Sequence, residues 1–290
     1  MGDVPMRASV GEGGKNKPAD VAIVQDLLNR QPTTMTQLKL DGLTSQELTD
    51  AIKKYQEEVM KSPEPDGRVD AGGGTYKRML KDATESTPER LFGSRRSTMG
   101  PTTRTAVVED LYKKQFGSTP AGLNVVVSAL IADVDITDIR WAAYMMATVK
   151  RETDNTFQPI EEYGKGKGRD YGDAVEYIDK AGVKHSHVYY GRGYVQITWL
   201  ANYLKLGEDL GLGDQLAADP AKALEPAIAY SIMSYGMRNG TFTGKKLSRY
   251  IAGTQCDYPH ARRIINGMDH AYEISAAAEA IEVILRVAVL

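Results

Sequence analysis

"TDIRWAAYMMATVKRETDNTFQPIEEYG", residues 137–164, is the stretch that decides how the second half of the chain folds. Its first part is apolar on more than one side from Trp141 to Val149, which predicts a helix buried inside a core. Asp138 can cap the start of this helix, and Glu152 stands at its end. The sequence therefore predicts a buried helix that carries a carboxylate to the edge of a core.

Two more glutamates follow Glu152 within a short distance. Desolvation at the edge of a core raises the pKa of a carboxyl group, which favours the protonated form that a general acid for glycoside cleavage needs. Glu161 and Glu162 come after Pro159, and we expect them on a loop that folds one of them back across a groove to face Glu152. Solvated side chains at a helix end fit the same spacing, so the carboxylates alone leave both interpretations open.

A second motif, "YYGRGYVQITWLANY" at residues 189–203, combines an aromatic pair, a Gly-Arg-Gly turn and a short strand-like run. Gln196, Thr198 and Asn202 supply neutral hydrogen-bonding groups. Neutral amides, hydroxyls and aromatic faces suit sugars, whose hydroxyls and C–H faces need both kinds of contact. A tyrosine-rich edge strand with its turn explains the motif equally well.

Composition excludes several classes of protein. The chain has 290 residues and a formal net charge of −2, so it has no global basic field that would attract nucleic acid. The single Cys256 excludes an internal disulfide. His185 and His187 suggest an exposed loop pair rather than a metal site, because no further ligand follows at zinc-site spacing. We expect no metal and no cofactor.

The two ends of the chain predict neither export by a signal peptide nor a membrane anchor. The first 20 residues lack a basic start followed by an apolar core, so we expect synthesis in the cytoplasm. The C-terminal "ISAAAEAIEVILRVAVL" is interrupted by Glu279, Glu282 and Arg286, which favours a helix that closes a core. Stable membrane insertion is therefore not expected.

Helical patterns dominate the rest of the chain. Residues 18–82 contain three short amphipathic helices separated by two Asp-Gly turns, and Thr44 or Ser45 can cap the second helix. Residues 83–100 are rich in Ser, Thr, Pro, Gly and charge, which is typical of a linker. The expected fold class is mainly α, with a small three-helix domain at 1–82 and a larger helical domain with little β structure at 101–290.

The small domain resembles the peptidoglycan-binding module found at one end of many cell-wall hydrolases. The matching segments span most of residues 10–82 and are "DVAIVQDLLN", "LDG", "AIKKYQ" and "PDGRVDAGGGTYKRML". The resemblance implies that this domain binds bacterial peptidoglycan. Without it, three small helices would favour a generic docking domain.

Residues 101–290 resemble the catalytic domain of phage endolysins related to glycoside hydrolase family 19, whose other members are chitinases. Four motifs carry the resemblance in order: "RWAAYMMATVKRET", "FQPIEEYG", "YYGRGYVQITWLANY" and "ARRIINGMD" at 261–269. The resemblance implies a lysozyme-like helical domain that needs no metal or organic cofactor.

The same resemblance implies roles for individual residues. Glu152 matches the general acid, and Glu161 or Glu162 matches the second carboxylate, with Glu162 fitting the Pro-x-x-Glu form better. Thr198 matches the hydroxyl residue that helps to hold the attacking water. The residues expected to bind sugar are Tyr190, Arg192, Gln196, Asn202 and Asn266. In one departure, Arg151 replaces the usual histidine before the acid. A cation beside Glu152 would oppose the upward shift of its pKa, unless the Arg151 side chain points away into the exposed face of the helix.

The implied activity is that of an endolysin, a muramidase-type enzyme that hydrolyses β-1,4 glycosidic bonds of peptidoglycan with inversion. An inverting pair of carboxyl groups lies roughly 6.5–9.5 Å apart, with a water between base and sugar. Such an enzyme would act as a monomer, reaching the wall from the host cytoplasm through a separate pore protein. The alternatives are a chitinase acting on N-acetylglucosamine polymers and a non-catalytic wall-binding or virion protein.

Overall fold

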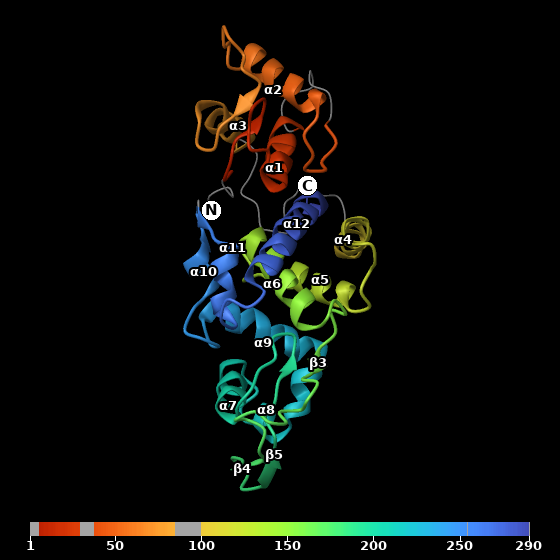
Figure 1. Ribbon diagram of the computed structural model, residues 1–290, viewed down its shortest axis with the longest axis vertical. Helices are drawn as coiled ribbons and strands as arrows, with labels where there is room; N and C mark the ends of the chain where they lie inside the picture. The colour runs from red at the N-terminus through yellow and green to blue at the C-terminus, as the bar shows by residue number, and fades with distance from the viewer. Residues whose placement is uncertain (1–5, 30–37, 85–99, 254, 290) are drawn as a thin grey trace.

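The computed structural model describes residues 6–29, 38–84, 100–253 and 255–289 of a mainly helical protein (Figure 1). The predicted mainly α fold class is confirmed. Buried apolar side chains form two separate clusters, one within residues 6–79 and a larger one within residues 108–288. Most of the predicted linker at 83–100 lies outside the described residues. No helix among the described residues has the length and apolar character needed to cross a membrane.

Three helices and a two-stranded sheet build the N-terminal module: α1 (Pro18–Asn29), α2 (Gln46–Glu58), α3 (Gly74–Thr84), β1 (Val10–Gly11) and β2 (Arg68–Val69). The Ser45 side chain caps α2 by accepting a hydrogen bond from the Leu48 N–H at 3.1 Å, as predicted. A buried glutamine holds each Asp-Gly turn: Gln25 accepts from the N–H of Gly42 at 3.0 Å, and Gln56 accepts from that of Gly67 at 2.9 Å. These two turns fix the module around its small core.

The larger body contains further helices, two short 3-10 helices and three small antiparallel pairs of strands. The helices are α4 (Pro101–Phe116), α5 (Leu123–Ala132), α6 (Ile139–Glu152), α7 (Leu200–Asp209), α8 (Gln215–Ala218), η1 (Pro220–Leu224), α9 (Pro226–Asn239), α10 (Leu247–Tyr250), α11 (Tyr258–Ala261), η2 (Arg262–Ile264) and α12 (Ala271–Val289). The strand pairs are β3 (Ile160–Glu161) with β6 (Arg192–Gly193), β4 (Val175–Ile178) with β5 (Lys184–His187), and β7 (Ile251–Ala252) with β8 (Gln255–Cys256).

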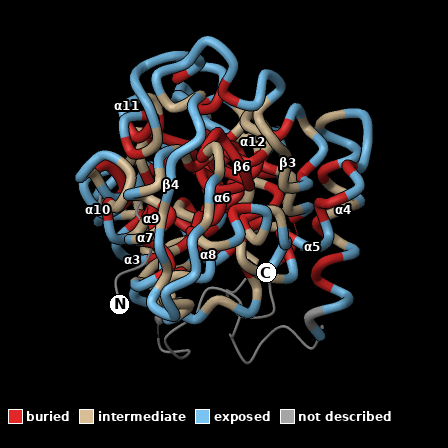
Figure 2. Tube along the Cα trace, turned by 90° about the horizontal axis from the view of Figure 1, so that it is seen from below, coloured by how far each residue is buried: buried red, intermediate tan, exposed pale blue. Residues whose placement is uncertain are grey.

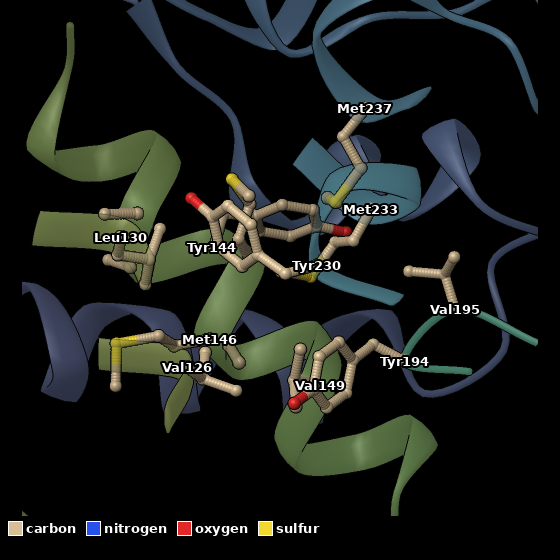
Figure 3. Packing of buried hydrophobic residues seen from close by; sticks show 14 of the residues in the cluster. Val126, Leu130, Tyr144, Met146, Val149, Tyr194, Val195, Tyr230, Met233 and Met237 are labelled. Atoms are coloured by element: carbon tan, nitrogen blue, oxygen red, sulfur yellow. The ribbon is translucent and has the colours of Figure 1, made fainter. Parts of the chain in front are cut away.

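Helix α6 runs through the buried centre of this body and packs along α12 (Figures 1 and 2). Its Tyr144, Met146 and Val149 side chains are fully buried. They lie among side chains of α5 and α9 (Figure 3). Asp138 caps the helix by accepting from the N–H of Arg140 at 2.9 Å. The predicted buried helix, its cap and its end at Glu152 are confirmed.

The strands differ from the sequence-based expectation. The strand-like run at 189–203 contributes only Arg192–Gly193 to a strand, because Gly193 turns the chain with a φ of +87°. Its backbone approaches the Ala223 carbonyl so closely that a Cβ atom would lie 2.9 Å from that oxygen. The hairpin β4–β5 was not predicted, and His185 and His187 lie on its second strand rather than on a loop.

A buried cluster of charges joins the two bodies. Arg7 of the N-terminal module donates to Glu282 of α12 at 2.9 Å, and Tyr258 and Arg286 donate to the same carboxylate at 2.9 and 2.7 Å. The Glu282 side chain is 1% exposed. Arg7 also donates to the Cys256 sulfur at 3.1 Å. Glu282, which interrupts the apolar C-terminal segment, is thus the anchor of a contact between the modules, and α1 lies beside α12 (Figure 1).

Candidate active site

The carboxylate of Glu152 lies at the end of α6 and is 17% exposed. Its partner is Arg262 of η2, whose Nη1 donates to Oε1 of Glu152 and whose side chain is 5% exposed. Arg262 also donates from Nε to the Asp269 carbonyl at 3.0 Å. A guanidinium at hydrogen-bonding distance stabilises the ionised carboxylate. Arg262, the charged partner of this carboxylate, is a residue that sequence analysis did not single out.

Arg151 does not contact Glu152, although the two residues are adjacent. Its Nη2 lies 2.7 Å from Nε2 of His270, and Nδ1 of His270 lies 3.0 Å from a carboxylate oxygen of Glu273. Of the two orientations that the sequence left open for Arg151, the structure has the one that points away from the acid. Successive residues of a helix point about 100° apart, and here Arg151 faces the turn before α12 while Glu152 faces Arg262.

A strained segment joins Glu152 to the two carboxylates of Glu161 and Glu162. Asp154, Asn155 and Phe157 have positive φ values of 48°, 60° and 55°, a conformation that costs free energy in residues other than glycine. The buried Thr153 hydroxyl donates to the Val149 carbonyl at 2.7 Å and accepts from the N–H of Phe157 at 3.0 Å. Phe157 is fully buried. These contacts fix the segment between α6 and β3.

Glu161 lies on β3, opposite Arg192 of β6, rather than on the expected loop. Tyr190 donates its hydroxyl to Oε1 of Glu161 at 2.5 Å, and the Lys165 ammonium lies 2.9 Å from Oε2. These two hydrogen bonds hold the pKa of Glu161 below its usual range, and the one from Tyr190 has the larger effect. Glu161 is therefore an ionised carboxylate, which is the state that a general base needs.

Glu162 has its own set of donors. Tyr171 donates its hydroxyl to Oε1 at 3.1 Å, and the N–H of Gly191 donates to Oε2 at 3.1 Å. Glu162 directly follows the end of β3, and it and Glu161 are held by different partners. Both carboxylates are half-buried and fixed in place, and both stay candidates for the second catalytic group.

Three predicted sugar-binding residues of the 189–203 motif make contacts inside the protein. Arg192 is 7% exposed, lies 3.5 Å from the ring centroid of Tyr190, and donates to the Tyr203 hydroxyl at 3.2 Å. Gln196 donates its amide to the carbonyls of Ile160 and Gly193, both at 3.0 Å. Gln196 therefore holds β3 against β6, and Tyr190 positions Glu161.

The remaining predicted residues are more accessible. Thr198 is half-buried. Asn202 lies in the first turn of α7, and its side-chain amide donates to the backbone carbonyl of Thr198 at 2.8 Å. Asn266 is exposed, and its side-chain oxygen accepts from the N–H of Gly267 at 2.8 Å. Thr198 and Asn202 thus lie at one place in the fold, whereas Asn266 lies on the segment that follows η2.

Two exposed aromatic residues were missed by sequence analysis. Trp199, next to Thr198, is 47% exposed, has a φ of +69°, and meets the Tyr171 ring edge-to-face with a centroid distance of 5.6 Å. Tyr163, next to Glu162, is fully exposed. Rings held open beside candidate catalytic residues suit the C–H faces of sugars. Each ring directly follows a candidate residue in the sequence, and this adjacency could have identified both rings.

The described part of the chain contains no group of three or more His, Cys, Asp and Glu side chains arranged to hold a metal ion. Nε2 of His185 is hydrogen-bonded to a carboxylate oxygen of Asp179 at 2.9 Å, and Nε2 of His187 is hydrogen-bonded to the Ala218 carbonyl oxygen at 3.0 Å. The polar groups that gather around Glu152, Glu161 and Glu162 are carboxylates, phenols and cations. Such a set can transfer protons to and from a bound substrate.

Comparison with known proteins finds similarity to solved structures only. Chitinase C from Streptomyces griseus HUT6037 is 22% identical over 62% of this chain and 76% of that protein, with a TM-score of 0.42. A bacterial family 19 chitinase is 22% identical over 62% of this chain and 95% of that protein, with a TM-score of 0.43. No family model and no curated protein sequence matches the chain.

Proposed function

We propose that this protein is a modular phage endolysin in which the larger body hydrolyses β-1,4 glycosidic bonds of bacterial peptidoglycan. The observation that carries the proposal is that Glu152 and Glu161 lie at the two ends of the fixed segment between α6 and β3. Glu152 is held at one end by Arg262, and Glu161 is held ionised at the other by Tyr190 and Lys165. The strained backbone between the ends gives the pair a defined spacing.

In the proposed reaction, Glu152 is the general acid. Because Arg262 pairs with Glu152 in the free protein, this contact must open before Glu152 can donate a proton to the substrate. A sugar chain that displaces water from the site favours the neutral acid. Glu152 then protonates the glycosidic oxygen as the bond from that oxygen to the anomeric carbon breaks.

Glu161 or Glu162 is the general base of the same step. It removes a proton from a water that the Thr198 hydroxyl orients, and the water oxygen bonds to the anomeric carbon from the opposite face of the sugar. The products are two shorter glycans, and the anomeric configuration is inverted. Proton transfer leaves the base protonated and Glu152 ionised, so loss of one proton and uptake of another restore the starting state.

Peptidoglycan rather than chitin is the proposed substrate for two reasons. The N-terminal module, with its own core, has the sequence pattern of wall-binding modules. The loop beyond Glu162 carries exposed Lys167 and Arg169, whose charge attracts the carboxylates of wall peptides. The protein would act on the wall as a monomer, after release from the host cytoplasm by a separate pore protein.

The test is a comparison of two polymers. Purified sacculi and chitin are incubated with equal amounts of the full chain, and the release of reducing sugar is measured. The proposal predicts release from sacculi at a rate at least tenfold above that from chitin. Faster release from chitin identifies a chitinase. Binding to sacculi without release from either polymer identifies a non-catalytic wall-binding protein.

A further inference from the structure

Three side chains form a clasp between the end of α6 and the start of α12. Arg151 approaches Nε2 of His270 at 2.7 Å, and Glu273 approaches Nδ1 of the same ring at 3.0 Å. An arginine can only donate hydrogen bonds and an ionised glutamate can only accept them. The contacts therefore match an arrangement in which Nε2 of His270 accepts from Arg151 and Nδ1 donates to Glu273.

The turn that His270 belongs to is also held by Arg262. The Nε of Arg262 donates to the carbonyl of Asp269 at 3.0 Å, while its Nη1 donates to Glu152. Arg151 and Glu152 are consecutive residues, so these contacts close a ring that runs from α6 through Arg262 and the turn back to α6. His270 has a φ of +56°, a strained conformation for a histidine. The clasp thus holds a strained turn in place.

We propose that His270 is a positioning residue for Glu152. By binding Arg151, it fixes the turn whose Asp269 carbonyl orients the Arg262 guanidinium, and the guanidinium in turn sets the place of the Glu152 carboxylate. His270 itself touches no reacting group. This inference rests on the proposed function, in which Glu152 is the general acid. It also gives Arg151, which replaces the histidine of the family pattern, a defined role.

The exposure of the clasp separates this role from a purely structural one. The side chains of His270 and Glu273 are 46% and 63% exposed. Hydrogen-bonded pairs this exposed contribute little to the free energy of unfolding. A small displacement of a catalytic group, in contrast, can lower a rate by about 100-fold. Loss of the clasp should therefore change the rate of hydrolysis far more than the melting temperature.

Two isosteric substitutions provide the test. In His270→Gln the amide oxygen can occupy the place of Nε2 and still accept from Arg151. In His270→Asn the amide nitrogen can occupy the place of Nδ1, so only the contact to Glu273 is kept. Asparagine adopts a positive φ more readily than histidine, so His270→Asn should fold at least as well as the wild type.

We expect His270→Gln to keep kcat within about twofold of wild type on solubilised glycan strands, and His270→Asn to lose about tenfold in kcat with KM unchanged. In a variant that already carries Arg151→Met, His270→Asn should cause no further loss. Equal kcat values for the Gln and Asn variants, or a change confined to KM, would overturn the proposal.

A spectroscopic measurement separates this inference from the proposed function. The Nε–H of Arg262 should give a slowly exchanging NMR signal in the wild type and in His270→Gln, and a rapidly exchanging one in His270→Asn. Equal exchange in all three proteins would show that His270 does not position Arg262, whatever the activity. If the wild type releases no reducing sugar but the exchange rates differ as predicted, the proposed function fails while the clasp is confirmed.

Discussion

Replacing Glu152 with glutamine should separate the chemistry of this protein from its folding. Glutamine has nearly the same shape as glutamate but no proton to donate at the glycosidic oxygen. General acid catalysis by a positioned side chain contributes about 10²–10⁴-fold to a rate. We therefore expect Glu152→Gln to hydrolyse peptidoglycan at least about 100-fold more slowly than the wild type.

The cost in stability should be small, and the contacts of Glu152 explain why. The side-chain oxygen of glutamine can still accept from Nη1 of Arg262, which keeps its bond to the Asp269 carbonyl. What is lost is the difference between a charge-assisted and a neutral hydrogen bond, about 1 kcal/mol. For a body of this size, that change lowers the melting temperature by about 2–4 °C.

The assay measures the release of reducing ends from sacculi together with thermal unfolding of each variant. Glu208→Gln is the matched control, because Glu208 also pairs with a cation but is 58% exposed on α7. It should leave both the rate and the melting temperature unchanged. A Glu152→Gln protein that keeps a third or more of wild-type activity would refute the assignment of the acid.

Three further predictions concern the contacts described above. Glu282→Gln should lower the free energy of unfolding by about 3–5 kcal/mol at pH 7, because it leaves buried arginines without a charged partner. Burial raises the pKa of Glu282, but its arginine partners outweigh burial and hold that pKa below its usual range. The stabilisation by Glu282 is therefore present above about pH 4.3, the pKa of an unfolded glutamate, and is lost as the pH falls through the lower pKa of the folded state. Calorimetry between pH 3 and pH 7 should show that the free energy of unfolding falls less with decreasing pH in the variant than in the wild type. Tyr190→Phe removes the donor that lowers the pKa of Glu161, so the acidic limb of the kcat/KM profile should move to higher pH when Glu161 is the base and stay in place when Glu162 is the base. Trp199→Ala should raise KM by about 3–10-fold with kcat unchanged, since a stacking ring contributes about 1 kcal/mol, and an unchanged KM would remove Trp199 from the sugar-binding surface.

The helices could be predicted because their signals are local. The apolar face of α6, the Asp138 and Ser45 caps and the Asp-Gly turns of the N-terminal module are all encoded within a few residues of where they act. The mainly α fold class follows from these signals. The glutamine that holds each Asp-Gly turn could not be predicted, because it comes from a helix distant in the sequence.

The contacts of the candidate site depend on long-range packing. Arg262 and Glu152 are separated by 110 positions, and no periodic pattern shows that they meet. Arg151 could be named as a cation next to the acid, but the direction of its side chain depends on how the turn before α12 packs. Gln196 looked like a sugar ligand because its amide suits sugars, whereas in the structure it joins β3 to β6, and Arg192 donates to the Tyr203 hydroxyl inside the protein.

Glu282 illustrates the same limit at the contact between the modules. In the sequence it interrupts an apolar segment, and this position argues only against a membrane anchor. In the structure it is buried and accepts hydrogen bonds from Arg7, Tyr258 and Arg286. Arg286 lies four residues further along the same helix and can be found in the local sequence, whereas Arg7 belongs to the other module and cannot.

The most direct test of the central claim is to identify the sugar at the newly formed chain ends. Purified Gram-negative peptidoglycan is digested with the wild type and with Glu152→Gln, and the products are analysed by mass before and after borohydride reduction. We expect new reducing ends on N-acetylmuramic acid with the wild type and almost none with the variant. Sacculi that bind the protein but gain no new reducing ends of either sugar would show that the protein is not a glycosidase of the wall.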